Sequence, residues 1–318
     1  MKWFNKKNIK MIILVLGTYA ISEILIKANI IDSYIEMNLV IIGINIILAV
    51  SLNLITGFTG QFSLGHAGFM AIGAYVSAIA TAKLDLPFIV AILLAAVSAA
   101  FVGLLIGIPT LRLKGDYLAI ATLGFSEIIK NILFNIEYVG GASGFNDIPQ
   151  YTTWTWIYFM VVITVTVIKN FVNSYAGRAC IAIREDEIAA EAMGVNTTLY
   201  KVLSFIIGAF FAGIAGALYA NYFYFIKPDA FGFMKSIDIL VIVVFGGMGS
   251  IKGSIVGAFL LSLISLLLQS VPEIRMILYS LILFTIMVYR PQGILGDYES
   301  SVKLFKRGGK LNVGNQNK

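Results

Sequence analysis

Apolar residues occur in long continuous runs along nearly the whole chain, and short polar stretches separate these runs. Ten runs qualify as candidate membrane segments: 9–26, 36–56, 66–82, 87–108, 116–135, 152–173, 201–225, 236–248, 253–270 and 274–290. About 20 apolar residues cross a bilayer core as an α-helix. The pattern therefore predicts an all-α fold, a polytopic transmembrane helical bundle of about ten segments with Gly-rich breaks. A β-barrel is disfavoured because the runs are continuously apolar rather than alternating.

Three of these segments are weaker than the others. Segment 66–82 is rich in Ala and Gly, and segment 116–135 contains Glu127 and Lys130. Glu127 either pairs with Lys130 about one helical turn away or lines a transport pathway. At ~1.5 Å per residue, segment 236–248 covers only about 20 Å of a ~30 Å core, so we expect a half-helix or a re-entrant segment there.

Two Gly-rich stretches interrupt the apolar runs, one in each half of the chain. The first is TGFTGQFSLGHAGF (56–69) and the second is GGMGSIKGSIVG (246–257). Broken backbone and polar side chains at membrane depth are costly, and they often mark a transport site. Together with Glu127, the residues predicted to line a pathway or gate are Asn53, Gly57, Gly60, Gln61, Ser63, His66, Gly246, Gly247 and Gly249. His66 has two alternative roles, a capping or packing residue at a helix start and a proton relay.

Lys and Arg are unevenly distributed between the two sides of the predicted bundle. With ten crossings both termini lie on one side, and that side receives 17 of the 23 basic residues. The positive-inside rule places this side in the cytoplasm, and both Gly-rich breaks fall near it, as expected for a cytoplasmic gate. The net charge of +6 is explained by orientation and lipid headgroup contact, so no nucleic-acid partner is expected. A poor cleavage site at Ala20-Ile21-Ser22 favours an uncleaved anchor over a signal peptide for the first segment.

The composition excludes several kinds of chemistry. The chain is 59% hydrophobic and only 13% charged, with a mean hydropathy of +0.89. One His and one Cys cannot build a zinc or copper cluster, and His66 would have to serve every role in a catalytic triad. Lys252 precedes its Gly in GGMGSIKGS, so the spacing of a phosphate loop fails. We therefore predict no catalytic residue, no metal and no cofactor on this chain; a membrane-bound transferase is the alternative from the enzyme class.

Small residues recur every four positions in three segments, which predicts close helix packing, with the lining of a conduit as the alternative. They are Ala95, Ala99, Gly103 and Gly107, then Gly208, Ala212, Gly216 and Ala220, and then Ser254, Ala258 and Ser262.

The loop 174–201 has helical character. SYAGRACIAIREDEIAAEAMGVNTTLYK contains a short amphipathic pattern that Gly194 breaks, after which Asn196 or Thr197 is placed to cap a new helix. Two short helices bent at Gly194 would form a docking surface on the cytoplasmic side. A solvated interfacial helix is the alternative.

This loop resembles the coupling loop of binding-protein-dependent ABC import permeases, whose loose pattern is Glu-Ala-Ala, three residues, then Gly. Ala189, Ala190 and Gly194 match it, whereas Ile188 stands where the acid is expected and Glu187 lies one residue earlier. The resemblance implies a set of ATPase-coupling residues: Arg184, Asp186, Glu187, Ala189, Ala190 and Gly194.

Five stretches in order resemble the branched-chain amino acid permeases of the LivM/LivH type, and GDYLAIATLGF points to the LivM side. They are NLITGFTGQFSLGHAGFMAIGAY (53–75), GDYLAIATLGFSEI (115–128), REDEIAAEAMGVNTTLYK (184–201), FGGMGSIKGSIVGA (245–258) and RPQGILG (290–296).

The resemblance implies the permease subunit of an ATP-driven importer of leucine, isoleucine and valine, located in a bacterial plasma membrane with both termini cytoplasmic. It implies a LivH-like second permease, two cytoplasmic ATPase subunits that bind ATP and Mg, and an extracytoplasmic amino-acid-binding protein. The organisation would be one permease domain over 1–300 and a basic cytoplasmic tail over 301–318. A urea or short-amide importer is the alternative within the same mechanism, and a facilitator or secondary transporter is the alternative outside it.

Overall fold

The structure, a computed structural model, describes residues 6–28, 31–111, 113, 115–267 and several short stretches between 277 and 296. Over these residues the fold is helical, and the only β pairing is one isolated bridge between Phe145 and Ile226. About half of the predicted segment 274–290 lies outside the described residues, and the tail 301–318 lies wholly outside them. The prediction of an all-α fold is confirmed.

Eleven α-helices span the described part of the chain, and nine of them correspond to the first nine predicted segments. They are α1 (Lys6–Lys27), α2 (Ser33–Asn53), α3 (His66–Ala82), α4 (Phe88–Thr110), α5 (Asp116–Asn135), α6 (Trp154–Asn173), α7 (Tyr175–Glu185), α8 (Glu187–Ala192), α9 (Thr197–Phe223), α10 (Phe233–Gly246) and α11 (Ile251–Leu267). Polar turns extend some helices beyond their apolar runs: α9 begins at Thr197 because the Asn196 side chain accepts a hydrogen bond from Leu199 N at 3.0 Å.

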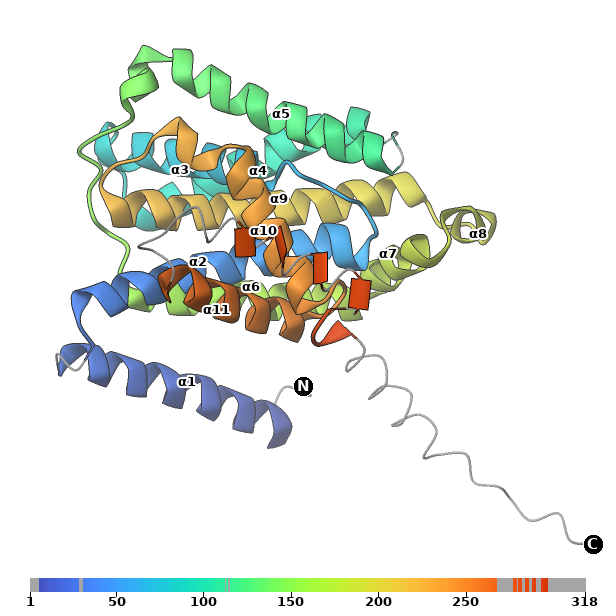
Figure 1. Cartoon of the computed structure of the whole chain (residues 1–318), viewed down its shortest axis with the longest axis horizontal. Coiled ribbons are helices and arrows are strands. Elements are labelled where there is room, and N and C mark those ends of the chain that lie inside the picture. Colours follow the sequence, from blue (N-terminus) through green and yellow to red (C-terminus); the bar gives the residue numbers. More distant parts are fainter. Residues whose placement is uncertain are drawn as a thin grey trace, which may run out of the picture.

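Helices α3, α4 and α9 form a closely packed group at one side of the bundle (Figure 1). A Cβ added to Gly216 of α9 would lie 2.0 Å from Met70 O of α3. One added to Gly103 of α4 would lie 2.7 Å from Ala209 Cβ of α9. At these positions the small residues let neighbouring backbones approach, so the packing interpretation of the α4 and α9 stripes is confirmed there.

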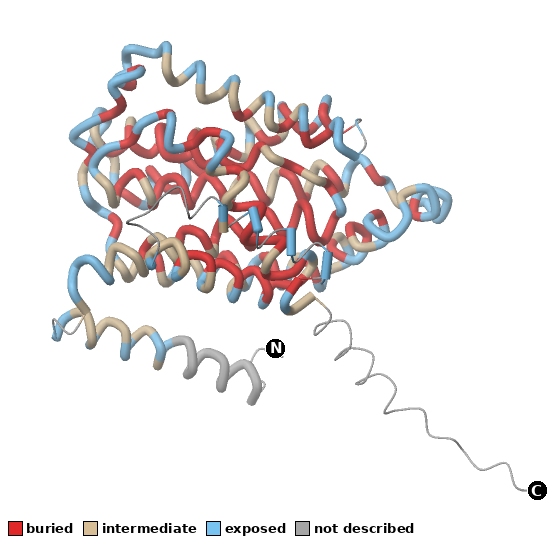
Figure 2. Tube along the Cα trace, viewed as in Figure 1, coloured by how far each residue is buried: buried red, intermediate tan, exposed pale blue. Residues whose placement is uncertain are grey.

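A second group is centred on α2, which packs against α6, α9, α10 and α11 (Figure 1). Helix α5 covers the outside of α3, and α1 lies at the edge of the bundle against α6. The α1 contact includes Trp154 Nε1, which donates to Ser22 Oγ at 2.9 Å. Buried residues are concentrated in the centre of the bundle, while α5 and residues 16–27 of α1 are more exposed (Figure 2). The two groups of helices are joined where α2 packs against α9.

Five stretches of the described chain are long and apolar enough to cross a membrane: Ser33–Phe58, Phe88–Thr110, Asp116–Asn135, Trp154–Asn173 and Thr197–Phe223. Helices α3 and α11 are apolar but shorter. Helix α10 has 14 residues, or about 21 Å at ~1.5 Å per residue, as expected for a half-helix. The count of ten segments stays a prediction.

Candidate functional site

The two Gly-rich breaks meet at the side chain of Asn53, the last residue of α2. Asn53 Nδ2 donates to Ser250 O at 2.9 Å and to Ser254 Oγ at 2.7 Å, and Asn53 Oδ1 accepts from Gly249 N at 2.8 Å. The Asn53 side chain is fully buried. We call Asn53, Gly57, Gly249, Ser250 and Ser254 the Gly-rich junction. It joins residues about 200 positions apart in sequence, as the separations of 196 to 201 show.

Glycine is required at position 57 because the backbone there lies against the Asn53 side chain and the Gly249 backbone. A Cβ on Gly57 would lie 1.8 Å from Asn53 Oδ1 and 2.3 Å from Gly249 N. Gly57 lies in the π-helical turn Leu54–Phe58 that follows α2, and Gly249 adopts a φ of +81° between α10 and α11. Gly246, at the end of α10, packs as closely on α11, since its Cβ would lie 2.2 Å from Gly253 O. The irregular backbone at these glycines is thus closely packed against protein rather than exposed to lipid.

Arg184 of α7 connects the loop 174–201 to this junction. Arg184 Nη1 donates to Gly57 O at 2.9 Å, and its guanidinium also pairs with the Glu185 carboxylate. A Cβ on Gly60 would lie 3.0 Å from Arg184 Cγ, and one on Gly249 would lie 2.7 Å from Arg184 Nη1. One side chain therefore touches both breaks and connects them to α7.

A third segment, 293–296, also packs on the second break. Ile294 N donates to Phe245 O at 3.1 Å, and Leu295 N donates to Gly246 O at 3.2 Å. A Cβ on Gly293 would lie 2.4 Å from Gly247 Cα, at the C-terminal end of α10. The last residues of the stretch RPQGILG thus donate hydrogen bonds to carbonyl oxygens at the C-terminal end of α10, which have no partner within that helix.

Polar atoms without partners are concentrated in the first break. Among the described residues, Thr56 Oγ1, both amide atoms of Gln61 and His66 Nδ1 are buried without a hydrogen-bond partner. His66, the first residue of α3, is buried, and its Nε2 lies 2.8 Å from Ser51 Oγ. Ser63 Oγ accepts only a long bond from Gly65 N at 3.4 Å. Each unpaired buried polar group costs about 1–3 kcal/mol, so this cluster is expected to have a function.

Glu127 lies away from the junction. Its Oε2 pairs with Lys130 Nζ at 2.5 Å, which confirms the predicted ion pair, and its Oε1 accepts from Phe233 N at 2.9 Å. Phe233 is the first residue of α10, whose other end carries Gly246. Glu127 therefore joins α5 to the start of α10.

The loop 174–201 differs in one respect from its prediction. The bend between its two short helices lies at Asp186, which separates α7 from α8, and Gly194 instead ends the turn after α8. Asp186 Oδ1 accepts from Ile188 N at 2.9 Å and from Ala189 N at 3.0 Å, so this acid caps α8. Gly194 has a φ of +83°, which supports the glycine requirement at this turn.

Glu187 contacts the chain itself, and the exposed residues of α8 and its C-cap are mainly apolar. Glu187 Oε1 lies 2.6 Å from Nζ of Lys201, which is buried at the start of α9. Ala190 is buried, whereas Ile188 and Met193 are 75% and 84% exposed. Helix α8 projects from one end of the bundle (Figures 1 and 2). The sequence interpretation placed Ile188 and Met193 in an amphipathic run but did not include them among the residues expected to contact an ATPase.

Long apolar helices, packed through small residues and interrupted by two Gly-rich breaks, define a multi-pass membrane protein. The family described as branched-chain amino acid transport system / permease component matches residues 34–288. The chain belongs to this family of transport permeases.

Several characterised relatives are similar over most of the chain. The high-affinity branched-chain amino acid transport system permease protein LivM of Salmonella typhimurium is 37% identical over 296 residues, which cover 82% of this chain and 70% of the relative. LivM of Escherichia coli K12 is 36% identical over the same shares. The permease protein LivH of Salmonella typhimurium is 27% identical, covering 80% of this chain and 91% of the relative. No solved structure matches the chain significantly.

Proposed function

We propose that this chain is the LivM-type permease subunit of an ATP-driven importer that moves leucine, isoleucine and valine across a bacterial plasma membrane. The observation that supports this most is the 36–37% identity to two LivM permeases over 82% of the chain. Similarity to LivH over 80% of the chain supports a second permease of the same fold as the partner. Two cytoplasmic ATPases would bind ATP and Mg, and an extracytoplasmic protein would deliver the amino acid.

The Gly-rich junction acts as a gate at the cytoplasmic side in this proposal. The unequal distribution of basic residues favours cytoplasmic termini, and with that orientation the junction and α7–α8 lie toward the cytoplasm. The exposed face of α8 contacts an ATPase, and Arg184 transmits the motion of α7 to Gly57. Gln61, Ser63 and His66 line the passage that opens when Gly57 and Gly249 separate.

The test uses the complete transporter in proteoliposomes, with labelled leucine and labelled urea as cargoes. Leucine uptake should depend on ATP and on the binding protein, and urea should not enter. Arg184→Met should keep both ATPases bound but lower the leucine taken up per ATP hydrolysed by about tenfold, because a charged hydrogen bond contributes ~1.5–3 kcal/mol. The matched control is Arg178→Met on the same helix, where Nη1 bonds only to the nearby Asn173 O.

Each outcome addresses a different part of the proposal. Urea uptake without leucine uptake would show that the cargo is urea rather than a branched-chain amino acid. ATP-independent uptake without a bound ATPase would show that the protein is a facilitator rather than an ATP-driven importer. Equal behaviour of Arg184→Met and Arg178→Met would refute the link between the loop and the gate.

A further inference from the structure

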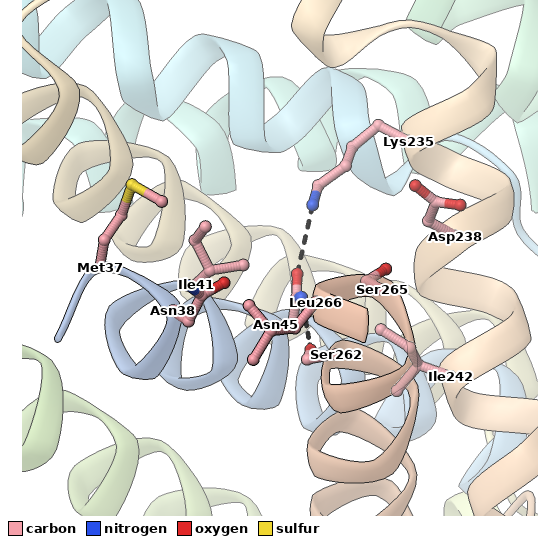
Figure 3. Close-up of a pocket in the computed structure, with 10 residues that line it drawn as sticks. All are labelled: Met37, Asn38, Ile41, Asn45, Lys235, Asp238, Ile242, Ser262, Ser265 and Leu266. Atoms are coloured by element: carbon pink, nitrogen blue, oxygen red, sulfur yellow. Dashed lines mark hydrogen bonds between the residues drawn. The ribbon is translucent and has the colours of Figure 1, made fainter. Parts of the chain in front are cut away.

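A polar cavity of about 190 Å³ lies between α2, α10 and α11, at a distance from the Gly-rich junction (Figure 3). Its lining combines two charged side chains, four small or amide polar side chains and four aliphatic ones. The residues are Lys235 and Asp238, then Asn38, Asn45, Ser262 and Ser265, and then Met37, Ile41, Ile242 and Leu266. None of them belongs to the gate or the loop described above.

Three polar side chains of this cavity are linked by hydrogen bonds. Lys235 Nζ donates to Asn45 Oδ1 at 3.2 Å, and Asn45 Nδ2 donates to Ser262 Oγ at 3.0 Å (Figure 3). Asp238 follows Lys235 by three residues on α10, so both charged groups lie on the same face of this helix. A cation and an anion inside a membrane bundle are expensive to maintain, which makes a functional role the default expectation.

Helices α2 and α11 contribute residues to both the cavity and the junction, which lie at different positions along their length. Asn53 bonds to Ser254 in the junction, and Asn45 bonds to Ser262 at the cavity. The two pairs are eight residues apart on both α2 and α11, or about 12 Å at ~1.5 Å per residue. A molecule in the cavity would therefore lie about 12 Å from the junction, on the side opposite the loop 174–201.

We propose that this cavity is a transit site for a zwitterionic amino acid with an aliphatic side chain. The inference rests on the proposed function and adds a location for the cargo. Lys235 faces the α-carboxylate, Asp238 faces the α-ammonium, and Ile41 and Ile242 border the aliphatic chain. The volume of about 190 Å³ lies below the ~300–1,000 Å³ of sites for drug-sized ligands, which suits a molecule of amino-acid size.

The chemistry of the lining separates this ligand from its competitors. Urea is neutral, so it offers no carboxylate to Lys235 and no ammonium to Asp238. A carboxylate or an amine with the same hydrocarbon chain can contact only one of the two charged side chains, whereas a zwitterion can contact both. A zwitterionic lipid headgroup also carries one positive and one negative charge, but it lacks the branched aliphatic chain.

The experiment measures protection of a single reporter cysteine in the complete transporter. Cys180→Ala removes the only native thiol, and Ser265→Cys or, separately, Asn38→Cys places a thiol in the cavity lining. N-ethylmaleimide, which is uncharged, labels the reporter. At leucine about ten times above its Kd, roughly one site in eleven stays free, so labelling should slow about tenfold. 4-Methylpentanoate, 3-methylbutylamine, urea and glycerophosphoethanolamine should not protect.

Asp238→Asn should abolish protection by leucine, whereas Asp229→Asn should retain it. Asp229 is an exposed acid in the turn Pro228–Phe231 just before α10, so it matches the charge change outside the cavity. Both reporters unprotected by leucine, in a transporter whose unsubstituted form takes up leucine, would overturn the site and leave the proposed function standing. Equal protection by 4-methylpentanoate would overturn recognition by two charges, and protection by glycerophosphoethanolamine alone would reassign the cavity to a lipid. Failure of the unsubstituted transporter to take up leucine would instead contradict the proposed function.

Discussion

Replacing Asn53 by Leu tests whether the Gly-rich junction is a gate. Leu has a similar size but cannot form the three hydrogen bonds of Asn53. Hydrogen bonds between membrane helices contribute ~0.6–1.7 kcal/mol each. Ser250 O and Ser254 Oγ keep a bond to each other at 3.2 Å, so only Gly249 N loses a partner outright. Together the losses amount to about 2–5 kcal/mol of junction stability.

Loss of general stability has to be separated from loss of the gate, and Asn221 provides the matched control. Asn221 is also fully buried, and its Nδ2 donates to Ser77 Oγ at 2.6 Å and to Ala217 O at 2.9 Å. Asn221→Leu removes one bond from α9 to Ser77 of α3 and one bond within α9, away from both breaks. Both variants should therefore lower the thermal unfolding midpoint of the purified transporter.

Only Asn53→Leu should uncouple the transporter. We expect leucine uptake per ATP hydrolysed to fall at least tenfold for Asn53→Leu, since ~1.4 kcal/mol already changes a two-state population tenfold. For Asn221→Leu the ratio should stay within about twofold of the unsubstituted transporter. Uptake and ATP hydrolysis are measured on the same proteoliposomes. If the two variants show the same ratio, the junction has only a structural role and the gate assignment is wrong.

Three further predictions follow from close packing, backbone angle and burial. Gly216→Leu should prevent assembly, because even its Cβ would lie 2.0 Å from a backbone oxygen, whereas Gly124→Leu, with nothing within 4 Å of its Cβ, should leave expression and uptake unchanged. Gly194→Val should reduce co-purification of the ATPases, because strain at φ +83° costs about 1–3 kcal/mol, and Gly194→Asn, a residue that tolerates this region, should reduce it less. Burial raises the pKa of the Cys180 thiol, so a maleimide at neutral pH should label this residue slowly from either side of the membrane. In the Cys180→Ala background, the exposed position Met193→Cys should be labelled rapidly in inverted vesicles and not in intact cells. Labelling of Met193→Cys in intact cells would contradict the cytoplasmic orientation.

The sequence predicted the helices well because their signal is local. Segments 66–82 and 116–135 match α3 and α5 residue for residue, although both were the weaker cases. Ala and Gly made the apolar signal of the first segment weaker, and the second contains the i,i+3 ion pair of Glu127 and Lys130. The apolar pattern alone cannot locate the bend at Asp186, since it depends on one side chain that accepts from Ile188 N and Ala189 N.

The sequence identified most members of the candidate site but not their contacts. Asn53 and Gly249 are about 200 residues apart, and nothing in the spacing shows that they bond. Arg184 was assigned to the ATPase surface, yet its guanidinium also reaches Gly57. Lys235 and Asn45 were overlooked because each is a single polar residue beside or within an apolar run, and their significance depends on their meeting across two helices.

Under the proposed function, a single hydrogen bond explains how the loop controls the gate. The bond between Arg184 and Gly57 O, worth about 1.5–3 kcal/mol as a charged hydrogen bond, favours the closed junction by roughly ten- to 150-fold. Movement of α7 with an ATPase would remove this preference and leave Asn53 as the main link between the breaks. Gly57 and Gly249 have no side chains to interlock, so the two breaks can separate once these polar contacts are broken. The cavity at Lys235 lies about 12 Å further along the same helices, and it can therefore hold the amino acid while the junction is still closed.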